Sequence, residues 1–441
     1  MVEDIKEGDI FVVIRGKSFD NLEDVGVALK RGAKLIITPE KLNLDVEQIV
    51  SENTRKVAEE WAERLYNLEG LEIVGITGTN GKTTTSFLIR EILNSCKGKT
   101  ALIGTVIWDD LTEVKISKLT TPERFYILRI LGRARRAGGR FAVMEVSSIG
   151  LDQGRVDGIR FRVGVFTNLT RDHLDYHGSM ENYLRAKLKL FRMLEEDAFA
   201  VINSDDLYAD DFIRSTKAKV ITYGKNGEFS FKILEHSVEG LVLNINGRVF
   251  ECGLLGEYNA YNITSAYVVS KVFGIPDECV KEALKGFKGV KGRLERVFSG
   301  EFHVFVDYAH TPDAIEKVLK ELRKFARRLI VVFGAGGNRD EGKRPLMGKV
   351  AERFADVIIL TSDNPRFEDP EKIIEDIAKG IKEKKFYKIP DRKGAISFAL
   401  NLAGKGDIVA ILGKGHESYQ EIMGVKYPFD DAEVVREVLN V

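Results

Sequence analysis

Cysteine and glutamine are both scarce in this chain of 441 residues. Its three cysteines, Cys96, Cys252 and Cys279, lie far apart and form no CxxC pair. An odd, dispersed set argues against a disulfide framework and against a structural zinc site, so we expect neither. Glutamine occurs at only three positions, whereas charged residues reach 30%. That bias is typical of proteins from hot habitats.

No sign of charge prevails, because Lys plus Arg and Asp plus Glu each total 67. The chain therefore has no overall attraction for nucleic acid or anionic membranes, and any anion must be held by local sites. Long apolar runs are also missing. The first 17 residues contain only residues 10–14 as an unbroken apolar run, far short of a signal segment or a ~20-residue span. We expect a cytoplasmic protein with no membrane insertion and no nucleic-acid partner.

The chain is too long for one ordinary core, and ~150 residues per domain suggests about three domains. From residue 71 onward, short apolar runs alternate with helical patterns, which is typical of parallel sheets with crossover helices. We predict an α/β protein with a small N-terminal α/β domain (1–70), a central domain with a mostly parallel sheet (71–294) and a C-terminal Rossmann-like domain (295–441).

The expected elements follow from the same patterns. Strands are predicted at residues 9–14, 34–38, 71–77, 101–104, 141–146, 163–168, 302–307, 329–334, 357–362 and 407–413. Helices are predicted at residues 83–94, 259–272, 277–285, 312–325, 344–354, 370–381 and 391–402. Between residues 229 and 252 apolar and polar residues alternate, and Asn246-Gly247 indicates the turn of an antiparallel ribbon.

A glycine-rich loop follows the first strand of the central domain, with the sequence Gly78-Thr79-Asn80-Gly81-Lys82-Thr83-Thr84. Glycines allow backbone N–H groups to face phosphate oxygens, and the helix N-terminus adds partial positive charge. The strict GxxxxGK[ST] pattern would need glycine where this chain has Ile76, so the loop is a variant. It predicts ATP binding, but kinases, GTPases and ligases share such loops.

Ionisable residues gather after the next predicted strands. Glu145 ends the apolar strand at 141–146, where ligands collect in parallel sheets, and is a candidate for magnesium. The segment 168–178 contains His173 and His177, and four of the six histidines lie in loops after predicted strands. Lys187, within a predicted helix, would by itself be interpreted as a solvated lysine.

These motifs, in this order, resemble those of the Mur ligases of peptidoglycan synthesis, and most closely the branch that adds the third residue of the peptide. The resemblance covers roughly residues 71 to 441. Besides the phosphate loop, it rests on Thr120-Thr121-Pro122, Glu145-Val146-Ser147-Ser148, Asp172-His173-Leu174-Asp175 and Asp307-Tyr308-Ala309-His310-Thr311-Pro312.

The resemblance implies a central P-loop ATPase domain and a two-step reaction. The γ-phosphate of ATP would pass to the D-glutamyl carboxylate of UDP-N-acetylmuramoyl-L-alanyl-D-glutamate, and an amine would then displace phosphate. Catalytic roles would fall to Lys82, Lys187 and His173. Thr83, with Lys82, would handle phosphates and magnesium. Glu145 and His173 would hold one Mg²⁺ and a carbamylated Lys187 another, because a carbamate supplies the oxygen ligand that a hard cation needs. A monomer is the family's expectation.

The resemblance also assigns binding residues. Beside the phosphate loop (Gly78, Thr79, Asn80, Gly81, Lys82, Thr83 and Thr84), the ATP set comprises Asn259, Asn262, Arg293 and Asp307. For the muramyl dipeptide, the matching residues are Thr120, Thr121, Ser147, Gln153 and Arg155.

The segment Asp363-Asn364-Pro365-Arg366 bears on the incoming amino acid, since in the family this run accompanies meso-diaminopimelate. Arg366 could hold a distal carboxylate bidentately, and Glu417 would face the distal ammonium. Arg339, Asn364 and Gly413 would complete the pocket. L-Lysine, which lacks the distal carboxylate, stays open as the alternative acceptor.

The chain also departs from the family. Ile149 stands where histidine is common, and Asn338 where aspartate is frequent. The Asp-Ser-Arg element that precedes the family's Pro-Gly-Asp-Leu-Phe segment has no counterpart before residues 6–11, so we expect a shortened UDP-sugar-binding domain.

Two rival interpretations remain. Folylpolyglutamate synthetases share the phosphate loop and the modified lysine, but are not expected to carry the residue 363–366 run together with Gly413-Lys414-Gly415-His416-Glu417. A nucleotide-gated regulatory protein without synthesis is the other, and the intact Lys82, Glu145, His173 and Lys187 argue against it.

Overall fold

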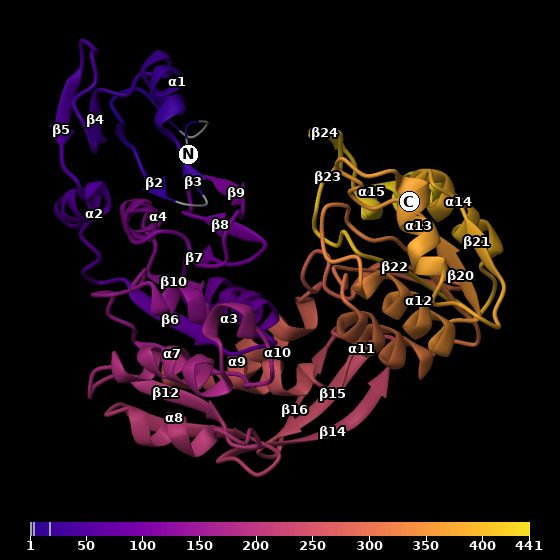
Figure 1. Cartoon of the computed structure of the whole chain (residues 1–441). Helices are drawn as coiled ribbons and strands as arrows, with labels where there is room; N and C mark the ends of the chain where they lie inside the picture. The colour runs from indigo at the N-terminus through magenta and orange to yellow at the C-terminus, as the bar shows by residue number, and fades with distance from the viewer. Residues whose placement is uncertain (1, 3–4, 17–18) are drawn as a thin grey trace. The chain divides into compact units, whose positions relative to one another are not determined.

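The computed structural model describes residue 2 and residues 5–16 and 19–441 (Figure 1). Two compact units make up the chain. The first comprises Met1–Lys82, Lys97–Ile202 and Asp206–Val220, and the second comprises Thr83–Cys96, Asn203–Asp205 and Ile221–Val441. Helices and β-strands alternate along the chain, which confirms the α/β prediction.

The first unit begins with a small parallel sheet in the order β1-β4-β5. Its strands are β1 (Ile10–Val12), β4 (Leu35–Thr38) and β5 (Glu47–Val50), and the two-residue strands β2 (Arg15–Gly16) and β3 (Phe19–Asp20) form a separate pair. The helices are η2 (Leu22–Asp24), α1 (Val25–Lys30) and α2 (Thr54–Leu65). A local core of Phe11, Val13, Val25, Ala28 and Ile36 joins β1, α1 and β4.

The larger sheet of the first unit runs in the order β12-β11-β6-β10-β7-β8-β9. Its parallel strands are β6 (Glu72–Thr77), β7 (Thr100–Ile103), β10 (Phe141–Glu145), β11 (Val163–Phe166) and β12 (Phe199–Asn203), and β8 (Ile107–Asp109) and β9 (Val114–Ile116) continue it antiparallel. The helices are α4 (Arg124–Arg136), α5 (Ser148–Asp152), α6 (Leu174–His177), α7 (Met180–Arg192) and α8 (Ala209–Ser215).

Register in this sheet brings three strand ends to one edge. Glu145 pairs with Ile76, and Phe166 pairs with Thr77. The segments that follow β6, β10 and β11 therefore leave the sheet side by side, because parallel strands share the direction in which they end.

The second unit begins at Thr83, within α3 (Lys82–Cys96), and β13 (Lys219–Gly224) ends in it. An antiparallel ribbon of β14 (Phe229–Ser237), β15 (Gly240–Ile245) and β16 (Arg248–Cys252) follows. Asn246 and Gly247 both have positive φ, as the predicted hairpin turn requires. Next come α9 (Asn259–Val272) and α10 (Asp277–Gly286), both confirmed as helices.

The rest of the second unit is a six-stranded sheet in the order β17-β18-β22-β19-β20-β21. Its strands are β17 (Glu295–Ser299), β18 (His303–Asp307), β19 (Leu329–Phe333), β20 (Val357–Leu360), β21 (Phe386–Lys388) and β22 (Ile408–Leu412), and only β17 is antiparallel to its neighbour. A separate pair, β23 (Tyr419–Ile422) and β24 (Val425–Pro428), follows β22.

Helices cover both faces of this sheet, because its strand residues alternate between two cores. Val331 and Phe333 pack with α11 (Pro312–Arg323), α12 (Lys343–Phe354) and α13 (Pro370–Ala378), whereas Ile330 and Val332 pack with α14 (Arg392–Leu402) and α15 (Asp431–Leu439). This is the doubly wound arrangement predicted for the C-terminal region. Across the part of the chain that the structure describes, no helix is both long and apolar enough to cross a membrane.

One expectation from the sequence was wrong. Cys96, at the end of α3, and Cys279, in α10, form a disulfide with their Cα atoms 6.0 Å apart. The two cysteines are separated by 183 residues, so their spacing in the sequence carried no sign of their contact. Cys252 is the free, buried thiol.

We predict that this disulfide stabilises the fold by about 2–4 kcal/mol, since it closes a long loop in the unfolded chain. The denatured, unreduced protein should contain one titratable thiol, and a reductant should lower the midpoint of thermal unfolding. In Cys279→Ser the reductant should change nothing. Three titratable thiols in the unreduced protein would contradict the link between α3 and α10.

Candidate active site

The loop between β6 and α3 is held in a conformation that only glycine permits at its first position. Gly78 has a φ of +150°, and a Cβ there would lie 1.9 Å from the hydroxyl of Thr167. Asn168, the next residue after Thr167, also holds the loop: its Oδ1 accepts from Asn80 N at 3.0 Å and its Nδ2 donates to Asn80 O at 3.0 Å. The end of the neighbouring strand thus shapes the phosphate loop.

Two lysines donate to the same carbonyl oxygen of this loop. Lys82 Nζ lies 2.9 Å from Gly78 O and 2.9 Å from Thr79 O. Lys187 Nζ, from α7, lies 2.8 Å from Gly78 O. Lys187 is therefore buried against the loop, and its interpretation as a solvated helix lysine was wrong.

The environment of Lys187 disfavours its charged form. Burial holds the pKa of its amine well below the ordinary value, and the nearby charge of Lys82 lowers it further, while Asp172 opposes the shift. The ring of Tyr183, one turn earlier on α7, lies 4.6 Å from Lys187 Nζ. The Tyr183 hydroxyl lies 3.1 Å from that of Thr79, and burial raises its pKa to about 12.

Glu145 lies wholly buried at the end of β10. Its Oε1 accepts from Thr105 N at 2.8 Å and its Oε2 from the Thr105 hydroxyl at 2.9 Å. His173 has a left-handed backbone with a φ of +52°. Its side chain is half exposed, with Nε2 3.5 Å from Asp172 Oδ2.

The donor types proposed for magnesium are chemically suitable, since Thr83, Glu145 and His173 offer hydroxyl, carboxylate and imidazole groups. Among the described residues, no three His, Cys, Asp or Glu side chains gather as a metal site. A carbamate on Lys187 would add an oxygen ligand directly at the phosphate loop. The buried amine on Gly78 O is the feature of this structure that fits such a group.

The five residues predicted for the muramyl dipeptide lie in one hydrogen-bonded network. Their contacts are Thr120 to Thr105 (3.1 Å between hydroxyls), Thr121 Oγ1 to Glu145 O (3.0 Å), Ser147 N to Thr121 Oγ1 (3.0 Å), Arg155 Nη1 to Thr121 O (2.6 Å) and Arg155 Nη2 to Gln153 Oε1 (2.6 Å). The Nε of Arg155 is buried without a hydrogen-bond partner in the described chain.

In the second unit, Asn259 and Asn262 lie buried on the first turn of α9. Asn259 Nδ2 donates to Leu255 O at 2.7 Å, and Asn262 Nδ2 donates to Asn259 Oδ1 at 2.7 Å. The hydroxyl of Thr85, on α3, lies 3.2 Å from Asn262 Oδ1. The two asparagines therefore bond to each other and to the phosphate-loop helix, and neither caps α9.

Arg293 and Asp307 lie beside Tyr308. Asp307 accepts from Leu294 N and Ala309 N, each at 2.7 Å, and burial raises the pKa of its carboxyl against the opposing charge of Arg293. The Arg293 guanidinium lies 5.3 Å from the centre of the Tyr308 ring. Its Nε is buried with no hydrogen-bond partner among the residues the structure describes.

His416 also packs against Tyr308, with the two ring centres 5.0 Å apart. Burial, and then the charges of Arg293 and Lys291, lower the pKa of the imidazole to about 4. The ring is therefore neutral at physiological pH.

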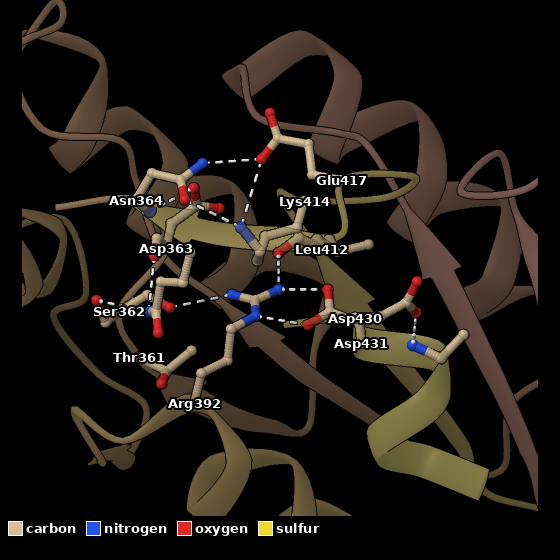
Figure 2. Close-up of polar contacts among 12 residues, drawn as sticks. Thr361, Ser362, Asp363, Asn364, Arg392, Leu412, Lys414, Glu417, Asp430 and Asp431 are labelled. Carbon is tan, nitrogen blue, oxygen red and sulfur yellow. Dashed lines mark hydrogen bonds and ion pairs between the residues drawn. The ribbon is translucent and has the colours of Figure 1, made fainter. Parts of the chain in front are cut away.

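Asn364 and Glu417 meet at the carboxyl edge of the six-stranded sheet (Figure 2). Asn364 Nδ2 donates to Glu417 Oε2 at 2.8 Å. Lys414 lies beneath them, fully buried, with Nζ 3.1 Å from Asn364 Oδ1 and 3.4 Å from Glu417 Oε2. An ammonium thus contacts both candidate side chains.

Arg366 follows Asn364 by two residues and contacts Gly337 and Glu421. Its φ is +53°, Nη1 donates to Gly337 O at 2.8 Å, and Nε lies 3.3 Å from Glu421 Oε2. Gly413 is required as glycine, because a Cβ would lie 2.4 Å from Asp363 Oδ2. Arg339 is exposed in the neighbouring loop.

Three residues of these sites were missed by sequence reasoning. Thr105 follows β7, so the strand-end argument that identified Glu145 could have found it. Tyr183 precedes Lys187 by four residues, the spacing of side-chain contact on one helix face. Lys414 was quoted within its motif but carried no role, since nothing in a sequence tells a buried lysine from an exposed one.

Two family models match this chain. The Mur ligase middle domain matches residues 76–270, and the Mur ligase glutamate ligase domain matches residues 292–415. Together they include the phosphate loop, Lys187, the α9 asparagines and most of the acceptor-side loops.

Full-length relatives agree with these models. A UDP-N-acetylmuramoyl-L-alanyl-D-glutamate–2,6-diaminopimelate ligase of Aquifex aeolicus is 46% identical over 99% of this chain and 92% of its own length. The enzyme of the same name from Caldanaerobacter subterraneus is 41% identical over 98% of this chain and 92% of its own.

Solved structures share the fold. A ligase of the same name is 35% identical, with a TM-score of 0.66 over 100% of this chain and 93% of that one. A D-alanyl-D-alanyl-adding ligase from Acinetobacter baumannii, 17% identical, has a TM-score of 0.74 over 100% of this chain and 92% of that one. With a relative 46% identical over nearly the whole length and family models over most of it, this chain belongs to the Mur ligase family of ATP-dependent ligases.

Proposed function

We propose that this protein uses ATP to join meso-diaminopimelate to the D-glutamyl carboxylate of UDP-N-acetylmuramoyl-L-alanyl-D-glutamate, as a step of peptidoglycan precursor synthesis. The main support for the proposal is that Lys82 and Lys187 both donate to Gly78 O in the phosphate loop. The Lys187 amine is buried there and its charged form is disfavoured, which is the condition that carbamylation requires. The relatives' names supply the substrates. A monomer in the cytoplasm is part of the proposal.

In the first step, a D-glutamyl carboxylate oxygen attacks the γ-phosphorus of ATP, the bond to the β-phosphate oxygen breaks, and ADP leaves. The phosphate loop and Lys82 bind and neutralise the phosphates. Asn259, Asn262, Arg293 and Asp307 are proposed to bind the nucleoside end. The network of Thr120, Thr121, Ser147, Gln153 and Arg155 is proposed to hold the dipeptide.

Carbamylation of Lys187 requires the neutral amine, because its free electron pair forms the N–C bond to CO₂. One C–O π bond opens in that addition, and an N–H proton is released to water to leave the carbamate anion. Burial and Lys82 both favour that form. The carbamate anion would then offset the charge of Lys82. The carbamate is proposed to hold one Mg²⁺, and Glu145 and His173 another, while Thr83 is proposed to handle phosphates and magnesium. Bound Mg²⁺ would stabilise negative charge on the transferred phosphoryl group.

In the second step, the amine nitrogen of the acceptor attacks the acyl carbon, gives up a proton, and phosphate leaves. We propose that Arg366 pairs with the distal carboxylate of diaminopimelate and Glu417 with its distal ammonium. Asn364, bonded to Glu417, orients that carboxylate, and Arg339 and Gly413 border the pocket.

Substrate dependence is the first test of this proposal. Phosphate release from ATP should require both the muramyl dipeptide and an amino acid, with diaminopimelate preferred over lysine and ornithine. If lysine were clearly preferred, the acceptor assignment would be wrong. If no amino acid supported dipeptide-dependent release, the ligase proposal would fail as a whole.

A second test concerns Lys187. ¹³C-labelled bicarbonate should give a carbamate signal in the wild type that rises with pH at fixed CO₂, since deprotonation supplies the reactive amine. Lys187→Arg should lose that signal and about 10³-fold in activity, because the charge stabilisation that a metal supplies is worth several kcal/mol. The matched control is Lys189→Arg, an exposed lysine on the same helix that pairs with Asp152 at 3.0 Å. A signal that persists in Lys187→Arg would place the carbamate elsewhere.

A third test concerns Arg366. Arg366→Ala should raise the KM for diaminopimelate about 10- to 100-fold, the value of one charge-assisted pair of ~1.5–3 kcal/mol, and leave the KM for the dipeptide near normal. Arg353→Ala, a solvent-exposed arginine of α12, should change neither constant. Equal losses for both substrates would contradict the assigned role.

A further inference from the structure

Arg392 is among the largest fully buried side chains of the described structure. It begins α14, and Asp431, at the start of α15, accepts from its Nε and Nη2 at 2.7 Å each. Both partners are inaccessible to solvent. The pair is bidentate, the arrangement that fixes a guanidinium in orientation as well as position.

Two further donors of Arg392 go to backbone carbonyls. Nη1 donates to Ser362 O at 3.2 Å and Nη2 donates to Leu412 O at 3.1 Å. Figure 2 shows the guanidinium between these two chain segments, with Asp431 on its other side. Because the side chain is fully buried, it acts on the protein's own backbone and does not reach a substrate directly.

The two carbonyls belong to strands that are not neighbours. Leu412 is the last residue of β22 and Ser362 lies two residues beyond β20, and β19 separates the two strands in the sheet. The arginine therefore spans the carboxyl edge across one strand. The segment after β20 also contacts the chain just before α14, where Ser362 N donates to Pro390 O at 3.3 Å.

Each of these segments carries one half of the proposed acceptor pocket. Asn364 follows Ser362 by two residues, and Glu417 follows Leu412 by five. Their 2.8 Å hydrogen bond and the contacts of Lys414 connect the two halves at the top. Arg392 connects the same two segments closer to the strands, through Ser362 O and Leu412 O.

Stability alone is a poor explanation for this arrangement. A buried ion pair must offset a large desolvation cost, and apolar side chains of similar volume often stabilise a core as well or better. An arginine fork, in contrast, sets the separation of the groups that it binds. Its position under two pocket loops indicates a geometric role.

We propose that Arg392, clamped by Asp431, is a positioning residue for the acceptor amino acid. By fixing the carboxyl ends of β20 and β22 relative to each other, it keeps Asn364 and Glu417 in the arrangement that the acceptor's distal groups require. This inference rests on the proposed function, because it concerns the pocket assigned there to diaminopimelate.

The test uses Arg392→Lys, which keeps the charge and loses the fork, and Asp431→Asn, which keeps the shape and loses the charge. The KM for diaminopimelate should rise at least about tenfold in both, as expected when a binding group is misplaced by a fraction of an ångström to 1 Å. The KM for the dipeptide should stay within about twofold, since none of the residues proposed to bind it belongs to these loops. Equal changes in the two constants, or none in the first, would overturn the proposal.

The matched control is Asp407→Asn. Asp407 is also inaccessible and accepts from Arg328 at 2.7 Å, but it precedes β22 and so lies at the opposite end of that strand. This variant should unfold at a lower temperature with the KM values for diaminopimelate and the dipeptide unchanged. A rise in the diaminopimelate KM for Asp407→Asn would show that loss of a buried pair anywhere in the sheet has the same effect, and would overturn the positioning role.

Hydrogen exchange on the wild type tests the same idea without any variant. If the clamp preforms the pocket, the amides of residues 361–366 and 412–417 should be protected before diaminopimelate is added. Rapid exchange that slows only after its addition would overturn the proposal.

Phosphate release by the wild type distinguishes failure of the proposed function from failure of the role of Arg392. If the wild type releases no phosphate, the proposed function is rejected. If it releases phosphate normally but the variants do not selectively raise the KM for diaminopimelate, only the role of Arg392 is rejected. If lysine proves to be the acceptor, its KM is the one compared.

Discussion

Gly78 has two structural roles, and the conformation of the phosphate loop depends on both. Its carbonyl oxygen accepts from Lys82 and from Lys187, while its α-carbon packs so close to Thr167 that no side chain fits. The first role brings α7 to the phosphate loop, and the second brings the end of β11. Two amines sharing one oxygen repel each other when both are charged. The loop thus disfavours the charged form of the buried amine.

The two units place their buried basic side chains in different environments. Lys187 is surrounded by a carbonyl, a tyrosine ring and another cation, so its neutral form is favoured. Arg392 keeps its charge, because Asp431 pairs with it on two nitrogens. An amine that must react benefits from the first environment, and a guanidinium that must hold backbone in place benefits from the second.

Much of this fold could be predicted from periodicity, and the failures have local physical reasons. Helix α9 ended where expected because its apolar residues are bounded by Gly256 and Gly274. The helix predicted to reach residue 381 ends at Ala378, yet Ile381 is still buried, so an apolar period continued beyond the helix. The contact of Cys96 with Cys279 depends on how α3 and α10 pack, which no spacing in the sequence encodes.

The residues of the candidate site also fall into those that the sequence could identify and those that it could not. Phosphate loops and strand ends are local features, so Gly78, Lys82 and Glu145 could be identified from sequence. Burial of Lys187 and Lys414 is a property of tertiary packing, and for Lys187 only the family resemblance indicated a role. Arg392 belongs to neither class, because it acts on carbonyls that exist as a pair only once β20 and β22 flank β19.

The surroundings of Arg366 also limit how strictly the pocket can select its amino acid. A site rejects an analogue most strongly when the missing group leaves a buried polar partner unpaired. Arg366 is not in that position, because Gly337 O and Glu421 already accept from it and its side chain is 22% exposed. Loss of the distal carboxylate, as in lysine, would remove a favourable ion pair without leaving a buried charge unpaired. In the proposed pocket, a preference for diaminopimelate over lysine would come from the additional ion pair that its distal carboxylate makes, and the size of that preference would depend on how well Asn364, Glu417 and Arg366 are held in place.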